Sequence, residues 1–282
     1  MTKGYHMIEK GLALPSPRPG FGVEATRELC EQIISAIKDD VCRHEVQLSV
    51  DALEGYVSFN EASSTPSPPH VLETISLARK AGIGRTGGPI RLVASTIDIP
   101  ANALSFIESR ASVREFAEEP VPREVLLNAA RSAQAAPCVC NRQAAKIYFL
   151  TSEKDRADAL HFQNGNRGFG DQSPVVAIIT MDTAEMFEPT ERYQHWIDGG
   201  LFAQNFLLAI HAQGYGACPL NWSAPITRDM GIRKLGYIKE SESIIMMVAI
   251  GALKREYKVA RSERRATSEI VRFVSEEQSS SI

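Results

Sequence analysis

The stretch WIDGGLFAQNFLLAIHAQGYG, residues 196–216, decides the fold of this chain. It predicts a long helix that is apolar on nearly every side, and such a helix must be buried all round, in a core or a subunit interface. Before and after it lie PVVAIITM (174–181) and SIIMMVAIG (243–251), short apolar runs typical of buried strands. We therefore expect this helix to pack on a sheet and to lie at the centre of a dimer.

Helices and strands alternate from about residue 97 onward. REVLLNAARSAQAA (123–136) predicts a helix with Pro122 at its start, a position that favours proline. AKIYFLT (145–151) predicts another strand, and GYGACPLNWS (214–223) predicts a glycine-containing turn after the long helix. Strands interleaved with helices indicate an α+β or α/β architecture.

The N-terminal third has a different character. Residues 22–60 predict two amphipathic helices, and HVLETISLARKAG (70–82) predicts a third. A Ser- and Pro-rich linker at about 61–70 separates them, and RTGGPI (85–90) is typical of a turn. We divide the chain into a helical N-terminal extension, residues 1–95, and a second domain, residues 96–282.

Composition excludes several function classes. The formal charge of -3 and the absence of a basic stripe argue against a general nucleic-acid binder. No apolar run reaches the length of a membrane span, and the first residues lack the layout of a signal peptide. Five irregularly spaced cysteines indicate reduced thiols, so we expect a cytoplasmic protein. Cys138 and Cys140 alone do not supply the four ligands of a zinc site, and no metal is expected.

Four clusters of polar residues could carry chemistry. SRASVREF (109–116) places Arg110, Ser112 and Arg114 beside an apolar segment, where clustered donors usually face an anion. The other clusters are the loop AAPCVCNRQAA (135–145), the segment Pro219–Trp222, and ARSERRATSEIVRF (260–273), where three arginines precede a last strand-like run. Taken singly, each has an ordinary explanation as solvated arginines, loop amides that satisfy the backbone, or a core tryptophan.

Taken in order, the clusters resemble the motifs of the nitroreductase family, FMN-dependent oxidoreductases that work as homodimers. The first motif corresponds to Arg110, Ser112, Arg114 and Phe116, and the second to the loop from Pro137 to Gln143. The third corresponds to Asp198–Gly216 with Pro219–Trp222, and the fourth to Arg261–Arg265. The resemblance covers about residues 97–275. It implies an α+β fold, a nitroreductase-like three-layer α/β/α sandwich with a mixed sheet, in a homodimer.

The resemblance also implies a binding site. Arg110, Ser112 and Arg114 would hold the FMN phosphate from one side, and Arg264, with Arg261 or Arg265, would close the other. Asn141 and Gln143 would bond the flavin edge or ribityl chain, and Leu220–Trp222 would lie near flavin N5. The predicted cofactor-binding residues are Arg110, Ala111, Ser112, Arg114, Pro137, Cys138, Val139, Asn141, Gln143, Asn166, Arg167, Pro219, Leu220, Asn221, Trp222, Arg261, Arg264 and Arg265.

The sequence departs from the family pattern at three places. Ala144 replaces a proline, Cys138 and Val139 replace serines, and Asn221-Trp222 replaces the Glu-Gly of many members. The implied activity is hydride transfer from NAD(P)H through flavin N5 to an electron-poor acceptor, with no catalytic side chain of the protein's own. The departure at Trp222 keeps open a flavin-dependent dehydrogenase or reductase acting on a biosynthetic intermediate. A flavin-fold scaffold subunit with little turnover is the third alternative.

The N-terminal run YHMIEKGLALPSPRPGFG, residues 5–22, resembles the front end of a nitroreductase subgroup that occurs with polysaccharide-synthesis proteins. Two interpretations remain open. The run is an arm that packs on the flavin domain, or His6 and Arg18 reach the mouth of the active site as a lid or bind an acidic sugar.

Overall fold

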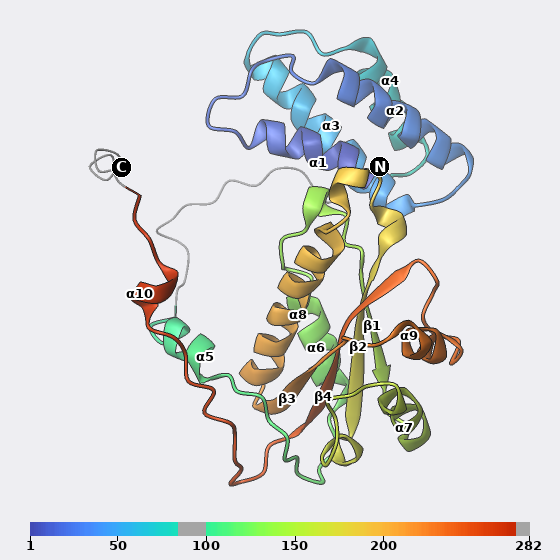
Figure 1. Cartoon of the computed structure of the whole chain (residues 1–282). Helices are drawn as coiled ribbons and strands as arrows, with labels where there is room; N and C mark the ends of the chain where they lie inside the picture. Colours follow the sequence, from blue (N-terminus) through green and yellow to red (C-terminus); the bar gives the residue numbers. More distant parts are fainter. Residues whose placement is uncertain (84–99, 275–282) are drawn as a thin grey trace.

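The computed structural model describes residues 1–83 and 100–274 of the chain. A central sheet carries helices on both faces, and a bundle of N-terminal helices sits at one end of it (Figure 1). The predicted domain boundary at residues 95/96 and the predicted turn at 85–90 lie outside the described residues.

The sheet has the strand order β1-β2-β4-β3. The described strands are β1 (Ala145–Leu150), β2 (Val175–Asp182), β3 (Tyr215–Asn221) and β4 (Glu242–Ala252). Each neighbouring pair among them is antiparallel. The predicted mixed sheet is therefore not what these strands form; the parallel pairing in the described chain is a single bridge between Ser112 and Ala217, beside β3.

Strand β3 corrects the turn predicted over residues 214–223. The turn is confined to Gly214, whose φ of +78° favours glycine, and the chain then pairs with β4 from Tyr215 to Asn221. Two glycines and a proline made this segment look irregular in sequence. Pro219 is tolerated because β3 lies at an edge of the sheet, where a missing N–H breaks few ladder hydrogen bonds.

Helices cover both faces of the sheet and make three layers (Figure 1). On one face, α6 (Arg123–Ala133) and α8 (Gln194–Ala212) bury their apolar side chains against β2 and β4. On the other face, α7 (Glu153–His161) and α9 (Ile226–Arg233) cover a second apolar cluster. Gly199 lets α8 approach the sheet closely, because a Cβ at this position would lie 2.6 Å from Ile245.

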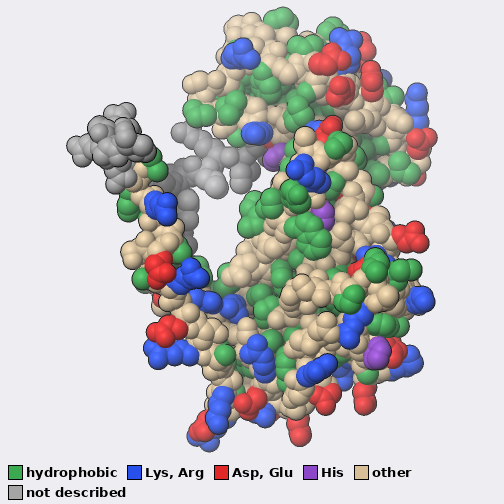
Figure 2. Space-filling model, viewed as in Figure 1, with side chains coloured by type: hydrophobic (Ala, Val, Ile, Leu, Met, Phe, Trp, Pro, Cys, Tyr) green, Lys and Arg blue, Asp and Glu red, His purple; other side chains and the backbone are tan. Residues whose placement is uncertain are grey.

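The outer side of α8 is exposed in the single chain. Trp196, Ile197 and Leu201 are 49%, 54% and 41% exposed, and apolar side chains gather over this part of the helix in Figure 2. Of the two predicted surroundings, the core of one copy buries only the inner side of the helix, and burial of its outer side in a subunit interface stays a prediction. Helix α8 therefore carries more apolar side chains than the core of one copy buries.

The N-terminal helices form a bundle with an apolar core of its own, built around Leu29, Ile33, Leu53 and Tyr56. They are α1 (Thr2–Leu12), α2 (Val23–Lys38), α3 (Arg43–Ala62) and α4 (Pro69–Lys80). The linker predicted at about 61–70 falls on the connection between α3 and α4. Helix α1 lies in the N-terminal run 5–22, and its Tyr5 and Ile8 are buried in the core of the bundle.

The remaining elements are short. They are α5 (Ala103–Ser109), α10 (Thr267–Ile270) and the 3-10 turns η2 (Val139–Asn141), η3 (Gly170–Gln172), η4 (Thr183–Glu185) and η5 (Pro189–Glu191). The strand-like run predicted near residue 271 is not a strand; it is an exposed stretch after α10, with no neighbouring strand described beside it. Within the described ranges, no helix combines the length and the apolarity needed to cross a bilayer.

Candidate functional site

The segment Arg110–Phe116 runs along the outer edge of the sheet beside β3. The backbone N–H of Val113 donates to the carbonyl of Ala217 at 3.0 Å, and that of Ala117 donates to Ala252 at 3.0 Å. Phe116 is buried against Gly251, where a Cβ would lie only 2.6 Å from its ring. The aromatic residue of the first motif therefore anchors the segment and fixes the position of the two arginines.

The two arginines of this segment have unused hydrogen-bonding capacity. Arg110 is half-buried, and its Nη1 is buried without a hydrogen-bond partner among the described residues. Arg114 is exposed; its Nη1 donates to the Ser112 carbonyl at 3.4 Å, and its guanidinium lies 5.8 Å from the centre of the Phe169 ring. No carboxylate in the described part of the chain forms an ion pair with either arginine. Two guanidiniums four residues apart on one segment, neither in an ion pair among the described residues, suit an anion with several oxygens.

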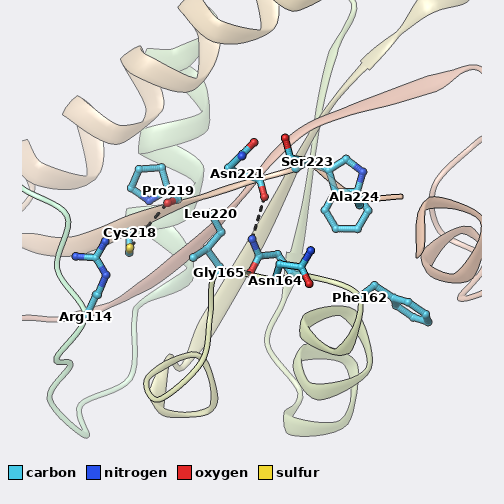
Figure 3. Close-up of a pocket in the computed structure, with 12 residues that line it drawn as sticks. Arg114, Phe162, Asn164, Gly165, Cys218, Pro219, Leu220, Asn221, Ser223 and Ala224 are labelled. Carbon is cyan, nitrogen blue, oxygen red and sulfur yellow. Dashed lines mark hydrogen bonds between the residues drawn. The ribbon is translucent and has the colours of Figure 1, made fainter. Parts of the chain in front are cut away.

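A cavity of about 330 Å³ opens beside Arg114 (Figure 3). One wall is the end of β3 and the residues that follow it, and the other is the loop after α7. The lining residues are Arg114, Phe162, Gln163, Asn164, Gly165, Cys218, Pro219, Leu220, Asn221, Trp222, Ser223 and Ala224. The structure thus brings Arg114 of the first predicted cluster and Pro219–Trp222 of the third to one cavity, whereas Arg110, Ala111 and Ser112 are not among the lining residues.

Gln163 joins the two walls of the cavity. It is 5% exposed, and its Nε2 donates to the carbonyl of Asn221 at 2.9 Å, while its Oε1 accepts the N–H of Gly165 at 2.6 Å. Sequence reasoning missed this residue, because no motif marks it. Its place at the end of a helix, before the glycine-rich run 164–170, was the available signal.

The predicted loop residues Asn166 and Arg167 do not line the cavity. The Asn166 amide points into its own loop and donates to the carbonyls of Leu160 and Gln163 at 2.9 and 2.8 Å. Arg167 is exposed. In this chain the loop therefore faces the cavity through Gln163–Gly165.

Trp222 lines the same cavity, and its indole is hydrogen-bonded to α9. Its Nε1 donates to Oδ1 of Asp229 at 3.0 Å, and the other oxygen of Asp229 accepts from Arg233 at 2.8 Å. These bonds hold the indole in a fixed position in the cavity lining.

Cys218 forms part of the cavity wall as an inert thiol. Burial raises its pKa, although Arg114 and Arg110 nearby oppose the shift. The thiol is therefore protonated at neutral pH, and the protonated form is a poor nucleophile.

The loop of the second motif lies elsewhere, before β1. Cys140, Asn141 and Gln143 all have left-handed backbones, with φ of 48°, 52° and 52°. Pro137, Cys138 and Gln143 border a separate, smaller cavity beside Asp198 and Phe202 of α8. Since β1 and β3 are opposite edges of the sheet, one copy of the chain does not bring this loop to the cavity beside Arg114.

Side chains from distant segments hold this loop in place. Asp198 is 3% exposed, and its carboxylate accepts the N–H of Val139 at 3.0 Å and the Gln194 amide at 2.7 Å. Arg142 forms a two-pronged ion pair with Glu191, both contacts at 2.7 Å. Arg142 therefore has a structural role, and this pairing lowers the pKa of Glu191 to about 2.

The three C-terminal arginines Arg261, Arg264 and Arg265 lie in a third place. They are exposed on the segment between β4 and α10, an arm that leads away from the sheet in Figure 1. Arg261 lies 3.6 Å from Glu263 in a solvent-exposed pair. None of the three lines the cavity beside Arg114.

The model of the nitroreductase family matches residues 107–164 and 152–252, together more than half of the chain. The chain belongs to the nitroreductase family. The match includes the Arg110–Arg114 segment, the loop before β1, and the cavity residues of β3. It ends before the C-terminal arginines.

Individual members of the family are distant from this one. A Streptomyces coelicolor protein named "Putative NADH dehydrogenase/NAD(P)H nitroreductase" is 27% identical over 175 residues, which are 55% of this chain and 84% of that protein. The solved structure of NfrA2 from B. megaterium superposes with a TM-score of 0.55 at 19% identity, covering 62% of this chain and 75% of that one. A Desulfovibrio desulfuricans "putative nitroreductase in complex with fmn" gives 0.52 at 22% identity, covering 62% and 96%. At these identities the structural likeness shows the shared fold.

Proposed function

We propose that this nitroreductase-family protein is an FMN-dependent oxidoreductase that moves hydride from NAD(P)H to an electron-poor acceptor. The observation that carries the proposal is Arg114, which lines a cavity of about 330 Å³ and, like Arg110 on the same segment, forms no ion pair among the described residues. The names of two relatives, an NAD(P)H nitroreductase and a nitroreductase bound to FMN, support it. We assign the flavin domain to residues 96–282 and regard residues 1–95 as an extension.

The residues present fit the phosphate end of FMN. A dianionic phosphate offers acceptors to the buried, unpartnered Nη1 of Arg110, to Arg114 and to the hydroxyl of Ser112. The wall from Pro219 to Trp222 would then border the ring. When bound, FMN supplies hydride chemistry at its ring nitrogen N5. This chain orients the cofactor through its donors and restricts access through the fixed Trp222.

We further propose that the site is completed in a homodimer. The loop with Asn141 and Gln143 lies at the opposite edge of the sheet from Arg114, and Arg261, Arg264 and Arg265 lie on an exposed arm. The exposed apolar side of α8, with Trp196, Ile197 and Leu201, offers a surface on which a second copy would pack. Such a copy would bring its own loop and arm toward the cavity of the first.

Visible absorption spectra and light scattering test the proposal together. Purified protein should be yellow or bind added FMN, bleach with NADH or NADPH under anaerobic conditions, and have the mass of two chains. A colourless protein that refuses FMN would contradict the flavin assignment. A monomer that binds FMN would contradict the proposal that a second copy of the chain completes the site.

A second candidate function is favoured by Trp222. Because Asp229 clamps the indole at the cavity wall, the space beside it accepts a narrower set of ligands than an open wall would. Such a site suits a flavin enzyme that reduces or dehydrogenates one biosynthetic intermediate. A flavin that stays yellow with both nicotinamides would support this candidate over the first, and rapid turnover of many nitroarenes and quinones would oppose it.

A further inference from the structure

Helix α1 of the N-terminal bundle packs against the second-motif loop, and a part-buried hydrogen bond joins the two. Tyr5 on α1 is 2% exposed, and its hydroxyl accepts the Asn141 Nδ2–H at 2.9 Å. Burial raises the pKa of the Tyr5 phenol above its ordinary value, although the bond from Asn141 opposes the shift, so the phenol is neutral at physiological pH. The contact is a neutral, desolvated hydrogen bond between two residues that lie far apart in sequence.

The loop needs such support because of its backbone. Cys140, Asn141 and Gln143 are left-handed without being glycine. Each such residue is strained by about 1–3 kcal/mol and persists only where its surroundings hold it in place. A loop with three of them in four positions relaxes to other conformations unless side-chain contacts prevent it.

Three contacts hold the loop, and they come from different parts of the chain. Asp198 of α8 holds the backbone at Val139, and Glu191 holds Arg142. Tyr5 holds the side chain of Asn141 itself, so it acts on the residue that the proposed function assigns to flavin contact. Nδ2 of Asn141 donates to Tyr5, and Oδ1 accepts a 4.0 Å contact from Cys138 Sγ, so a second lone pair of Oδ1 remains to accept a hydrogen bond from a ligand.

We propose that Tyr5 is a positioning residue for the cofactor loop, so that docking of helix α1 and binding of FMN are thermodynamically coupled. The inference rests on the proposed function and deepens it, by assigning the N-terminal extension a role at the same site. Reciprocity follows from linkage: whatever α1 contributes to FMN binding, FMN contributes equally to the docking of α1.

The test compares two tyrosine-to-phenylalanine variants of the same bundle. Tyr5→Phe removes the hydroxyl that bonds Asn141, whereas Tyr56→Phe removes a buried hydroxyl that has no hydrogen-bond partner among the described residues. FMN titration followed by fluorescence should give Tyr5→Phe a dissociation constant about 3- to 10-fold higher than wild type, the value of one net hydrogen bond. Tyr56→Phe should bind FMN as wild type does. Equal affinities for all three proteins would overturn the inference.

A double-mutant cycle distinguishes positioning from a general loss of stability. Tyr5→Phe in an Asn141→Ala background should leave FMN affinity unchanged, because Tyr5 acts through the Asn141 amide. A further loss of the same size in that background would mean that the hydroxyl acts by another route, against the proposal.

Hydrogen exchange of the wild-type protein keeps the inference testable if Tyr5→Phe does not fold. FMN should slow amide exchange in α1 as well as in residues 110–114 and 219–222. Protection of residues 110–114 and 219–222 with no change in α1 would overturn the coupling and leave the proposed function standing. Failure of the wild-type protein to bind FMN at all would instead remove the proposed function and, with it, this inference.

Discussion

The Arg110–Arg114 segment and the loop before β1 both match family motifs, but their polar groups are used differently. Among the described residues, the guanidiniums of the segment have no carboxylate partner, and the buried Nη1 of Arg110 has no hydrogen-bond acceptor. In the loop, Val139, Asn141 and Arg142 all bond to side chains from other parts of the chain. The segment therefore keeps donors that no described carboxylate neutralises, whereas the strained backbone of the loop is held by side chains from other elements.

The largest effect should follow from removing the open donors. Arg110→Ala with Ser112→Ala removes a guanidinium and a hydroxyl from the proposed phosphate site, and charge-assisted hydrogen bonds contribute about 1.5–3 kcal/mol each. We expect FMN affinity to fall about 100-fold or more, measured by fluorescence titration, with the fold retained by circular dichroism. Arg123→Ala, which removes an exposed arginine of α6, is the matched control and should bind normally. Unchanged affinity in the double variant would show that the phosphate lies elsewhere.

A smaller effect should follow from releasing the loop. Asp198→Ala leaves the Val139 N–H and the Gln194 amide without their acceptor, which destabilises a buried site by about 1–3 kcal/mol. We expect a lower midpoint of urea unfolding and FMN binding weakened about 5- to 10-fold. The exposed Asp171→Ala serves as the control. If Asp198→Ala lost stability but bound FMN as wild type does, the shape of the loop would not matter for the cofactor.

The third effect depends on pH. The Arg142 guanidinium lowers the pKa of Glu191 from 4.5 to about 2, so the pair stabilises the folded state above the unfolded pKa and this contribution is lost as pH falls toward 2. Thermal unfolding of wild type and Glu191→Gln should therefore differ most near neutral pH and converge in strong acid. If the difference in unfolding temperature between the two proteins stayed constant down to about pH 2, the charge of the Glu191 carboxylate would not contribute to stability.

The smallest effect should come from the cavity wall. Trp222→Phe keeps a ring but loses the Nε1–H bond to Asp229, which contributes about 0.5–1.5 kcal/mol. We expect a slightly lower urea midpoint, with FMN affinity within about twofold of wild type. A tenfold loss of FMN affinity would instead mean that the indole N–H contributes to cofactor binding. The contrast between the Arg110–Arg114 segment and the polar groups that bond within the protein would then not hold for Trp222.

The elements that sequence predicted correctly depend on local signals. Helices α2 and α3 follow from apolar periodicity, α6 follows from a proline at its start, α8 follows from a long apolar run, and β1, β2 and β4 follow from short apolar runs. Strand β3 was mistaken for a turn because Gly216 and Pro219 disfavour strands except where an edge position tolerates them. The mixed sheet came from the family resemblance, whereas the described strands pair antiparallel.

The parts that sequence could not predict depend on distant partners. Helix α1 contains Gly4 and Gly11, and glycine lowers the intrinsic propensity of a segment to form a helix. Packing requires glycine at position 11 all the same, because a side chain there would collide with Phe21. Gln163 acquires its role from Asn221, which lies 58 positions later in the chain. Motifs mark Arg110, Ser112, Arg114 and Pro219–Trp222, and of these Arg114 and Pro219–Trp222 line one cavity, while their role in binding FMN stays a prediction. The cytoplasmic location and the link to polysaccharide synthesis stay predictions.

The hydrogen bond between Tyr5 and Asn141 joins residues 136 positions apart, and this separation bears on how the protein is made. At a translation rate of about 5–20 residues per second, Asn141 is added on the order of 10 s after Tyr5. All four helices of the bundle leave the ribosome within that interval, and they bring together an apolar core of their own. We therefore expect the loop with its left-handed residues to leave the ribosome after the bundle has folded. Asn141 would then adopt its conformation against a Tyr5 that is already in place.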